Sequence, residues 1–178
     1  MRELDQEYLM QCFDYSIDTG LLVWKERPIE HFKDLRAQAS WNSTNAGRPT
    51  AQSQTTHGYL RVSINKQRYF AHRVVFALIN GFWPKQVDHA NGIKTDNRIC
   101  NLRACSQSEN MMNRRARAKG TRSGVKGVNW CMHSKKWNAR IYVNGRSTSF
   151  GYFSSVEEAA QAVSCARKQY HKDFANNG

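Results

Sequence analysis

Apolar and polar residues alternate along several short segments of the chain, which predicts strands with one buried face. Residues 58–65 carry apolar side chains at every second position from Leu60, and residues 68–70 follow after a short polar turn. These two segments are expected to form a hairpin. A short buried helix is predicted for residues 71–80, because apolar residues dominate it and Gly81 follows as a stop signal.

The residues before this hairpin show a weaker pattern. A short helix is predicted for residues 4–13, and a strand for residues 21–24 after a turn at residues 18–20. Residues 28–57 are poor in apolar side chains and contain two prolines, so this segment is expected to be mostly loop.

A second hairpin and helix are predicted further along the chain. Residues 86–89 and 102–105 are strand candidates, separated by a loop rich in Asn, Gly and Asp. Ser106 and Glu109 have the spacing of a capping box, which indicates a helix that begins there and continues to Arg115.

The last part of the sequence predicts three strands followed by a helix. The strands are expected at residues 125–131, 136–143 and 146–153, with the Asn144-Gly145 pair as a tight hairpin turn. Ser155 begins a second capping box. Small and apolar side chains then recur at helical spacing, as expected for a helix packed on a sheet: Val156, Ala159, Val163, Ala166 and Tyr170.

Composition narrows the class of protein. The chain has 178 residues, 40% of them hydrophobic, which is enough for a folded core. It has neither a signal peptide pattern nor a run of 18 apolar residues. The five cysteines include no Cys-x-x-Cys pair, which argues against a disulfide scaffold and a thiolate zinc site. A cytoplasmic location, in a bacterial or phage-infected cell, is therefore expected, with no membrane partner.

The positive charge is confined to part of the sequence. Lys and Arg number 27 against 14 Asp and Glu, a net charge of +13. Residues 1–57 hold 6 basic and 8 acidic residues, residues 58–119 hold 12 and 3, and residues 120–178 hold 9 and 3. This distribution favours a surface that binds nucleic acid. On charge alone, a merely soluble basic protein remains an alternative.

One constellation has the chemistry needed for phosphodiester hydrolysis. Asp88 and Asn110 offer oxygen ligands of the kind that Mg²⁺ prefers. His89 can accept a proton from water near neutral pH. Asn101 could brace the long loop, and Arg114 would lie on the same helical face as Asn110, as a phosphate clamp.

This segment resembles the HNH endonucleases of the ββα-metal fold, particularly the phage and intron-associated homing type. The resemblance implies that Asp88 is a metal ligand, His89 the general base, Asn101 the loop brace and Asn110 the second ligand. The final His of the motif is replaced by Asn, a common variant in this branch. Asp-His alone would more often be structural, and the two spaced asparagines reverse that judgement. Three loop residues are better explained as turn formers (Asn91, Asp96 and Asn97), and His72 as structural.

The resemblance also extends to the preceding residues. It covers residues 69–75 and 80–84, and at the N-terminus residues 13–15, 19–20 and 22–25. The residues expected to contact DNA in and around this module are Arg73, Arg98, Arg103, Asn113, Arg114 and Arg115.

The C-terminal segment resembles the Apetala-type, or ethylene-response-factor, DNA-binding domain. Residues 123–130, 136–141, 151–153 and 157–160 carry the resemblance. It implies a three-stranded sheet, backed by a helix, that enters the major groove. The expected contacts are Lys126, Asn129, Trp130, Lys135, Arg140 and Arg146. Core packing of Trp130 and Trp137, and a solvated face for the strand charges, remain alternatives. Asn129 and Arg140 depart from the plant pattern, so sequence preference does not carry over.

These inferences combine into an α+β protein with four segments. Residues 1–57 are an N-terminal, β-rich lead-in, and residues 58–115 are a central ββα-metal HNH nuclease module. A basic linker at residues 116–123 leads to residues 124–178, a C-terminal three-stranded antiparallel sheet packed on one helix. The protein is expected to be a monomeric, homing-type DNA endonuclease. It is expected to act on double-stranded DNA and to use Mg²⁺, with Mn²⁺ as a substitute. Neither a structural zinc nor a small-molecule cofactor is expected. A non-catalytic DNA-binding regulator, and RNA or ribosome binding, are the alternatives.

Overall fold

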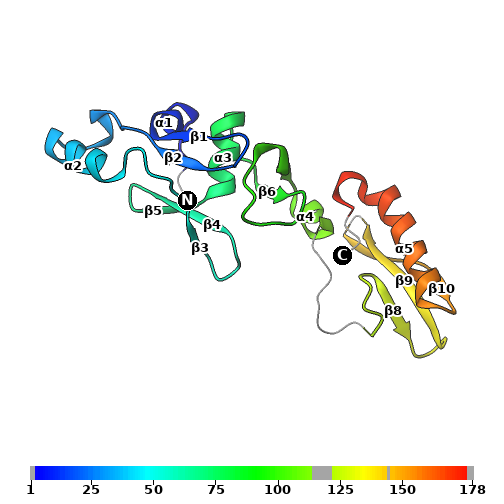
Figure 1. The fold of residues 1–178 in the computed structure, drawn as a ribbon. Coiled ribbons are helices and arrows are strands. Elements are labelled where there is room, and N and C mark those ends of the chain that lie inside the picture. Colours follow the sequence, from blue (N-terminus) through cyan, green and yellow to red (C-terminus); the bar gives the residue numbers. More distant parts are fainter. Residues whose placement is uncertain (1–2, 114–121, 144, 176–178) are drawn as a thin grey trace. The chain divides into compact units, whose positions relative to one another are not determined.

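A computed structural model describes residues 3–113, 122–143 and 145–175 of the chain. It divides into two compact units, Met1–Ala104 and Cys105–Gly178, each of which is described by itself. The fold is mixed α+β, as predicted, with strands at the N-terminus, a central helix and a C-terminal three-stranded sheet packed on a helix (Figure 1).

The first unit begins with helix α1 (Gln6–Cys12), capped by the side chain of Asp5. Strands β1 (Phe13–Tyr15) and β2 (Leu22–Trp24) then form an antiparallel pair. The helix and the second strand were predicted from the sequence, whereas no strand was predicted at β1.

The prediction that residues 28–57 are mostly loop is wrong. This segment contains a short 3₁₀ helix (Ile29–His31), helix α2 (Leu35–Asn45) and strand β3 (Ser53–Gln54). Helix α2 has no buried residue, so it lacks the apolar stripe from which a helix is recognised in a sequence. Its one local signal is the N-cap, where Asp34 accepts a hydrogen bond from the backbone N–H of Ala37 at 2.7 Å.

The predicted hairpin and buried helix are confirmed. Strands β4 (Leu60–Ile64) and β5 (Gln67–Phe70) pair directly, and β3 adds to the far edge of β4. Helix α3 (Ala71–Asn80) follows at once and ends at Gly81, whose φ of 78° is left-handed. Residues of α1, α3 and the two sheets share one hydrophobic core.

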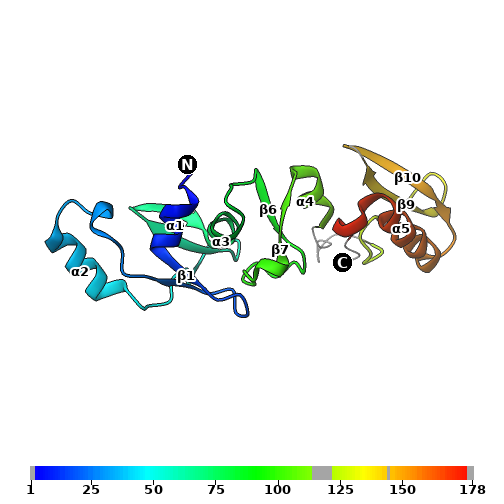
Figure 2. The ribbon, with the colours of Figure 1, turned by 90° about the horizontal axis from the view of Figure 1, so that it is seen from above.

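The second predicted hairpin is also present. Strands β6 (Gln86–His89) and β7 (Leu102–Cys105) form a two-stranded sheet and lie side by side in Figure 2. Helix α4 (Gln107–Asn113) follows in the second unit. Its capping box is formed as predicted, because the backbone N–H of Ser106 donates to Glu109 and that of Glu109 donates to Ser106.

The rest of the second unit is an antiparallel sheet on one helix. Strand β9 (Lys136–Val143) lies between β8 (Val128–Cys131) and β10 (Arg146–Phe153), and α5 (Val156–His171) covers one face. The predicted Ser155 cap is formed, with the N–H of Glu158 donating at 3.1 Å. Of the predicted stripe, Tyr170 is exposed and its ring contacts Phe150. Asn144, part of the predicted turn, lies outside the described residues.

Candidate active site

Strand β6 ends in the adjacent residues Asp88 and His89, which are 7% and 3% exposed. The carboxylate of Asp88 accepts two hydrogen bonds through Oδ2, from Nε of Arg103 at 3.0 Å and from a terminal guanidinium nitrogen at 2.8 Å. Arg103 lies on the neighbouring strand β7. The ion pair therefore fixes the direction of the carboxylate at the end of the hairpin.

The imidazole of His89 is held in one tautomer. Its Nε2 lies 3.1 Å from Oδ1 of Asn97, and both residues are buried. An amide oxygen can only accept, so Nε2 carries the hydrogen and the basic lone pair is on Nδ1. Burial lowers the pKa of His89, partly opposed by the Asn97 bond and by the charges of Asp88 and Asp96. The ring is thus neutral at pH 7 and able to accept a proton.

Asn101 fastens the loop between the two strands at both ends. Its side-chain oxygen accepts from the backbone N–H of Asn91 at 2.9 Å, and its amide group donates to the backbone carbonyl of Asp96 at 2.8 Å. The backbone N–H of Ala90 also donates to the carbonyl of Asn101. These are the bonds expected from a residue that braces the loop.

A second set of contacts holds the far end of the same loop. Asp96 pairs with the guanidinium of Arg98 through bonds of 2.8 and 2.7 Å, and this pairing holds the pKa of Asp96 well below its usual range. Tyr15 of β1 donates its hydroxyl hydrogen to the carbonyl of Asn97 and accepts the N–H of Ile99. At Gly20, where φ is +73°, a Cβ atom would lie 2.6 Å from the backbone nitrogen of Arg98. The N-terminal hairpin therefore supports the loop directly.

The ring of His72, on α3, packs beside the imidazole of His89, the candidate base. Its ring centroid lies 4.9 Å from that of His89 in an edge-on arrangement, 5.2 Å from that of Tyr59 and 5.5 Å from that of Phe70. Burial, and then the neighbouring His89, lower the pKa of His72 to about 3. His72 is therefore a neutral, packed ring, and the structural role predicted for it agrees with this burial.

Folding should become less favourable in acid because of His72. The imidazole of the unfolded chain has a reference pKa of about 6.5 and is protonated below that pH, whereas the folded protein keeps His72 neutral. Stability is therefore lost as the pH falls below about 6.5. His72→Gln is expected to reduce the difference in unfolding free energy between pH 7 and pH 5 by about 2 kcal/mol. Urea unfolding in EDTA at both values measures it. The exposed control His57→Gln should leave the difference unchanged, and equal behaviour of both variants would refute the argument.

Comparison with known proteins fits this geometry. Residues 69–112 match a family model described as an HNH endonuclease. The chain is 30% identical to Protein 3.8 of Escherichia phage T7 over 115 residues, which are 62% of this chain and 93% of that protein. The chain belongs to the family of Protein 3.8 and contains an HNH endonuclease domain. No solved structure matches it.

The HNH match confirms the resemblance to HNH endonucleases for residues 69–112 and supports a nuclease that acts on nucleic acid. The matched segment contains Asp88, His89, Asn101 and Asn110. The first three lie in the first unit at the β6–β7 hairpin, while Asn110 lies on α4 in the second unit. The structure therefore brings three of the four predicted residues to one loop.

The remaining candidates near the HNH domain are engaged in other contacts. Arg98 and Arg103 pair with Asp96 and Asp88 as described. Arg73 donates to the carbonyl of Pro84 at 3.0 Å, with its guanidinium 5.6 Å from the ring centroid of Trp83.

On α4 the candidate Asn113 is buried. Arg114, Arg115 and the predicted linker up to residue 121 lie outside the described residues.

The sheet of the second unit presents the other candidates differently. Asn129 and Arg140 are exposed on the face away from α5, and Lys135 and Arg146 are exposed near the strand ends. Trp130 lies opposite Trp137 with ring centroids 5.0 Å apart, and Trp137 packs against the core. Core packing, the alternative considered for Trp137, is therefore what the structure shows.

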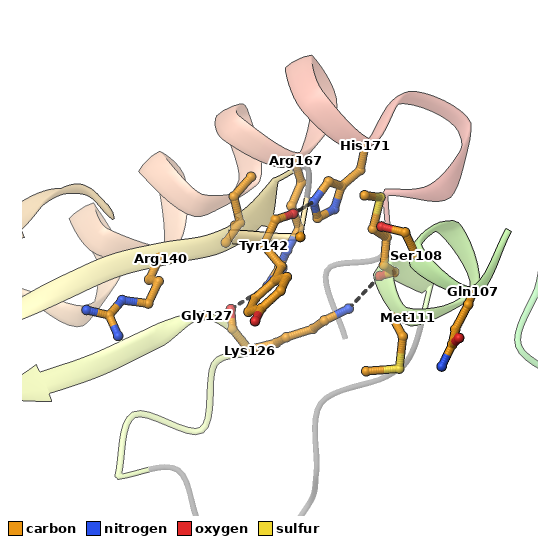
Figure 3. Close-up of a pocket in the computed structure, with 12 residues that line it drawn as sticks. Gln107, Ser108, Met111, Lys126, Gly127, Arg140, Tyr142, Arg167 and His171 are labelled. Carbon is orange, nitrogen blue, oxygen red and sulfur yellow. Dashed lines mark hydrogen bonds between the residues drawn. The ribbon is translucent and has the colours of Figure 1, made fainter. Parts of the chain in front are cut away.

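Lys126 is engaged beside a pocket of about 440 Å³ lined by α4, the sheet and α5 (Figure 3). Its ammonium group donates to the carbonyl of Met112 at 2.9 Å, and Arg167 donates to the carbonyl of Lys126 at 2.6 Å. His171 bonds the carbonyl of Tyr142 at the same pocket. These bonds connect the segment before β8 to α4 and α5, and the end of α5 to β9.

The described residues contain no cluster of three or more His, Cys, Asp or Glu side chains that could hold a metal ion. A site in which one carboxylate, one amide and water molecules hold the ion would not contain such a cluster. Across the described part of the chain, no helix is both long and apolar enough to cross a membrane.

Proposed function

We propose that this chain is a metal-dependent DNA endonuclease of the homing type, which hydrolyses phosphodiester bonds to 5′-phosphate and 3′-hydroxyl ends. The observation that carries the proposal is the geometry of His89, a buried imidazole beside Asp88. Its Nε2 bonds Asn97 and its Nδ1 is the basic nitrogen, and it lies within the segment that matches an HNH endonuclease. A base of this kind is what the deprotonation of water near neutral pH requires.

The oxygen donors of two residues have the chemistry that suits a hard divalent ion such as Mg²⁺, with Mn²⁺ as a substitute. Asp88 supplies a carboxylate whose direction is fixed by Arg103, and Asn110 would supply a neutral amide oxygen. When bound, the ion supplies positive charge for the phosphate and the leaving 3′ oxygen.

The chain's own groups position and deprotonate the attacking water, and the leaving 3′ oxygen takes its proton from solvent. His89 takes the proton of the attacking water at Nδ1, while Asn97 keeps the other nitrogen protonated. Asn101 holds the loop that positions this pair.

The C-terminal sheet would direct the nuclease to its target. We propose that residues 124–178 act as an Apetala-type domain that docks in the major groove, with residues 58–115 as the nuclease module and residues 116–123 as the linker. The exposed positions of Asn129 and Arg140 on the face away from α5 support this docking mode.

End-mapping of cleaved plasmid DNA tests the proposal. With Mg²⁺ or Mn²⁺ the protein should produce 5′-phosphate and 3′-hydroxyl ends, and EDTA should abolish cleavage. A second candidate is a regulator that binds DNA without cutting it. The observation that favours it is that both bonds from Arg103 go to Oδ2 of Asp88, where the guanidinium competes with a metal ion for that oxygen. Absence of cleavage with either metal, alongside intact DNA binding, would decide for the regulator.

Asn97 was predicted to be a turn former, whereas its side chain bonds the imidazole of His89, and we propose that it is a positioning residue. Asn97→Ala should lower the cleavage rate about 10- to 100-fold, because the imidazole of His89 loses the acceptor that fixes its tautomer. Single-turnover cleavage measures the rate, and DNA affinity in EDTA should stay the same.

Asn97→Asp is the informative companion variant. It retains an acceptor but places a negative charge beside the ring, so the pKa of His89 should rise and the rise of activity should begin at higher pH. If both variants cleave like the parent across the pH range, Asn97 has no part in the reaction.

A further inference from the structure

The sheet of β3, β4 and β5 has one face in the core and one face open. Alternation along β4 buries Val62 and Ile64 and turns Arg61 and Ser63 to the other side. The register places Ser53 and Phe70 on either side of Arg61, in one row across the three strands.

A second row continues the same face. Ser63 lies opposite Arg68 on β5. Arg68 and Phe70 are exposed, while Tyr69 between them is buried. The open face therefore offers guanidinium groups, hydroxyl groups and an aromatic ring.

The segment of the chain that forms this face carries charge of one sign. From Leu35 to Val87 the sequence has no Asp or Glu, and the acidic residues before it end at Asp34. No ion pair within the described residues involves Arg48, Arg61 or Arg68. The basic residues of this stretch are Arg36, Arg48, Arg61, Lys66, Arg68, Arg73 and Lys85.

A polar hollow of about 380 Å³ lies at the edge of the face. Its donors are the kind that contact phosphate oxygens, guanidinium groups beside hydroxyl and amide groups. The polar residues that line it include Arg48, Arg61, Thr44, Asn45, Ser53 and Ser63.

The same face leads to the candidate active site within one unit. Phe70 is 37% exposed, and its ring stacks on His72 with centroids 5.5 Å apart and an interplanar angle of 23°. His72 in turn contacts His89. A strand of nucleic acid lying on the sheet would thus pass close to the candidate base.

We propose that this cationic sheet face, formed by Arg48, Arg61, Ser63, Arg68 and Phe70, binds the sugar-phosphate backbone of duplex DNA beside the bond to be cut. The proposal rests on the proposed function for the identity of the nucleic acid. It adds a second DNA contact to that of the C-terminal sheet, so that the nuclease unit itself grips its substrate.

DNA binding of the full chain in EDTA tests this surface without cleavage. Anisotropy of a labelled 30-base-pair duplex is measured from 0.05 to 0.3 M salt for the parent and for Arg61→Gln/Arg68→Gln. Loss of two phosphate contacts should lower the slope of log K against log salt by about 1.8 and the affinity at 0.15 M by about 30-fold.

The matched control is Lys33→Gln/Arg36→Gln, which removes the same charge beside α2 and should change affinity less than about twofold. Arg61→Lys/Arg68→Lys keeps the charge and should keep the parent slope. Parental slope and affinity in the Gln variant, or lost slope in the Lys variant, would overturn the proposal. So would tighter binding of a structured RNA at equal salt. A protein that binds as expected but yields no cleaved ends refutes only the nuclease function.

Discussion

His89→Ala is expected to lower the rate of DNA cleavage by about 10²- to 10⁴-fold, the range typical for loss of a general base. The side chain is 3% exposed and carries the only proposed proton acceptor. Water alone must then lose its proton without a positioned base. Single-turnover cleavage of plasmid DNA with saturating Mg²⁺ measures the rate.

Two measurements separate the loss of chemistry from the loss of the fold. DNA affinity in EDTA should be the same for His89→Ala and the parent, because His89 is 3% exposed and is not among the proposed DNA contacts. His57→Ala, at an exposed histidine of the same unit, should cleave at the parental rate. A variant that retains full cleavage would exclude His89 as the base, whatever metal is used.

Local signals were sufficient for several elements of the fold. Helix α3 is apolar along most of its length and stops at a left-handed glycine, so periodicity and a stop signal define it. The capping box at Ser106 and the N-cap at Ser155 also formed as expected. Helix α2 was not predicted because it is half-polar and buries no residue. Such a helix has no apolar stripe that could be recognised in the sequence.

Some residues of the candidate site could likewise be predicted from the sequence, and others could not. Asp88, His89 and Asn101 could be found because their spacing along one hairpin is itself a signal. Tyr15 could not, since it meets the loop through a contact between residues 84 positions apart. The partner of His89 was visible in the sequence, but an Asn in a turn-rich loop is most simply a turn former. Only the fold shows that Asn97 points at the imidazole.

The sequence does not indicate a role for residues 26–57. In the structure, Arg27 connects this segment to the core of the first unit. This guanidinium is 3% exposed and lies among four aromatic rings, with centroid distances of 4.9 to 5.9 Å. It also donates to Tyr8, to Asn65 and to Nδ1 of His31. No ion pair within the described residues includes it. The rings belong to Tyr8, Trp24, Phe32 and Trp41.

Arg27→Met should lower the free energy of unfolding by about 2 to 4 kcal/mol. Methionine fills most of the space but removes the hydrogen bonds to Tyr8, Asn65 and His31 and takes the cation away from the rings. Relief of the buried charge offsets part of this loss, since a charge without a carboxylate partner is costly to bury. Four ring faces and three hydrogen bonds outweigh that relief.

Urea unfolding followed by the fluorescence of Trp24 and Trp41 measures the change, since both rings face the guanidinium. The control Arg36→Met removes an exposed charge from α2 and should stay within about 0.5 kcal/mol of the parent. Arg27 joins α1, α2 and the turn after β4, so its loss should lower the unfolding midpoint of the whole first unit rather than release α2 alone. A separate early transition, with the main midpoint unmoved, would show that α2 is only appended to this core.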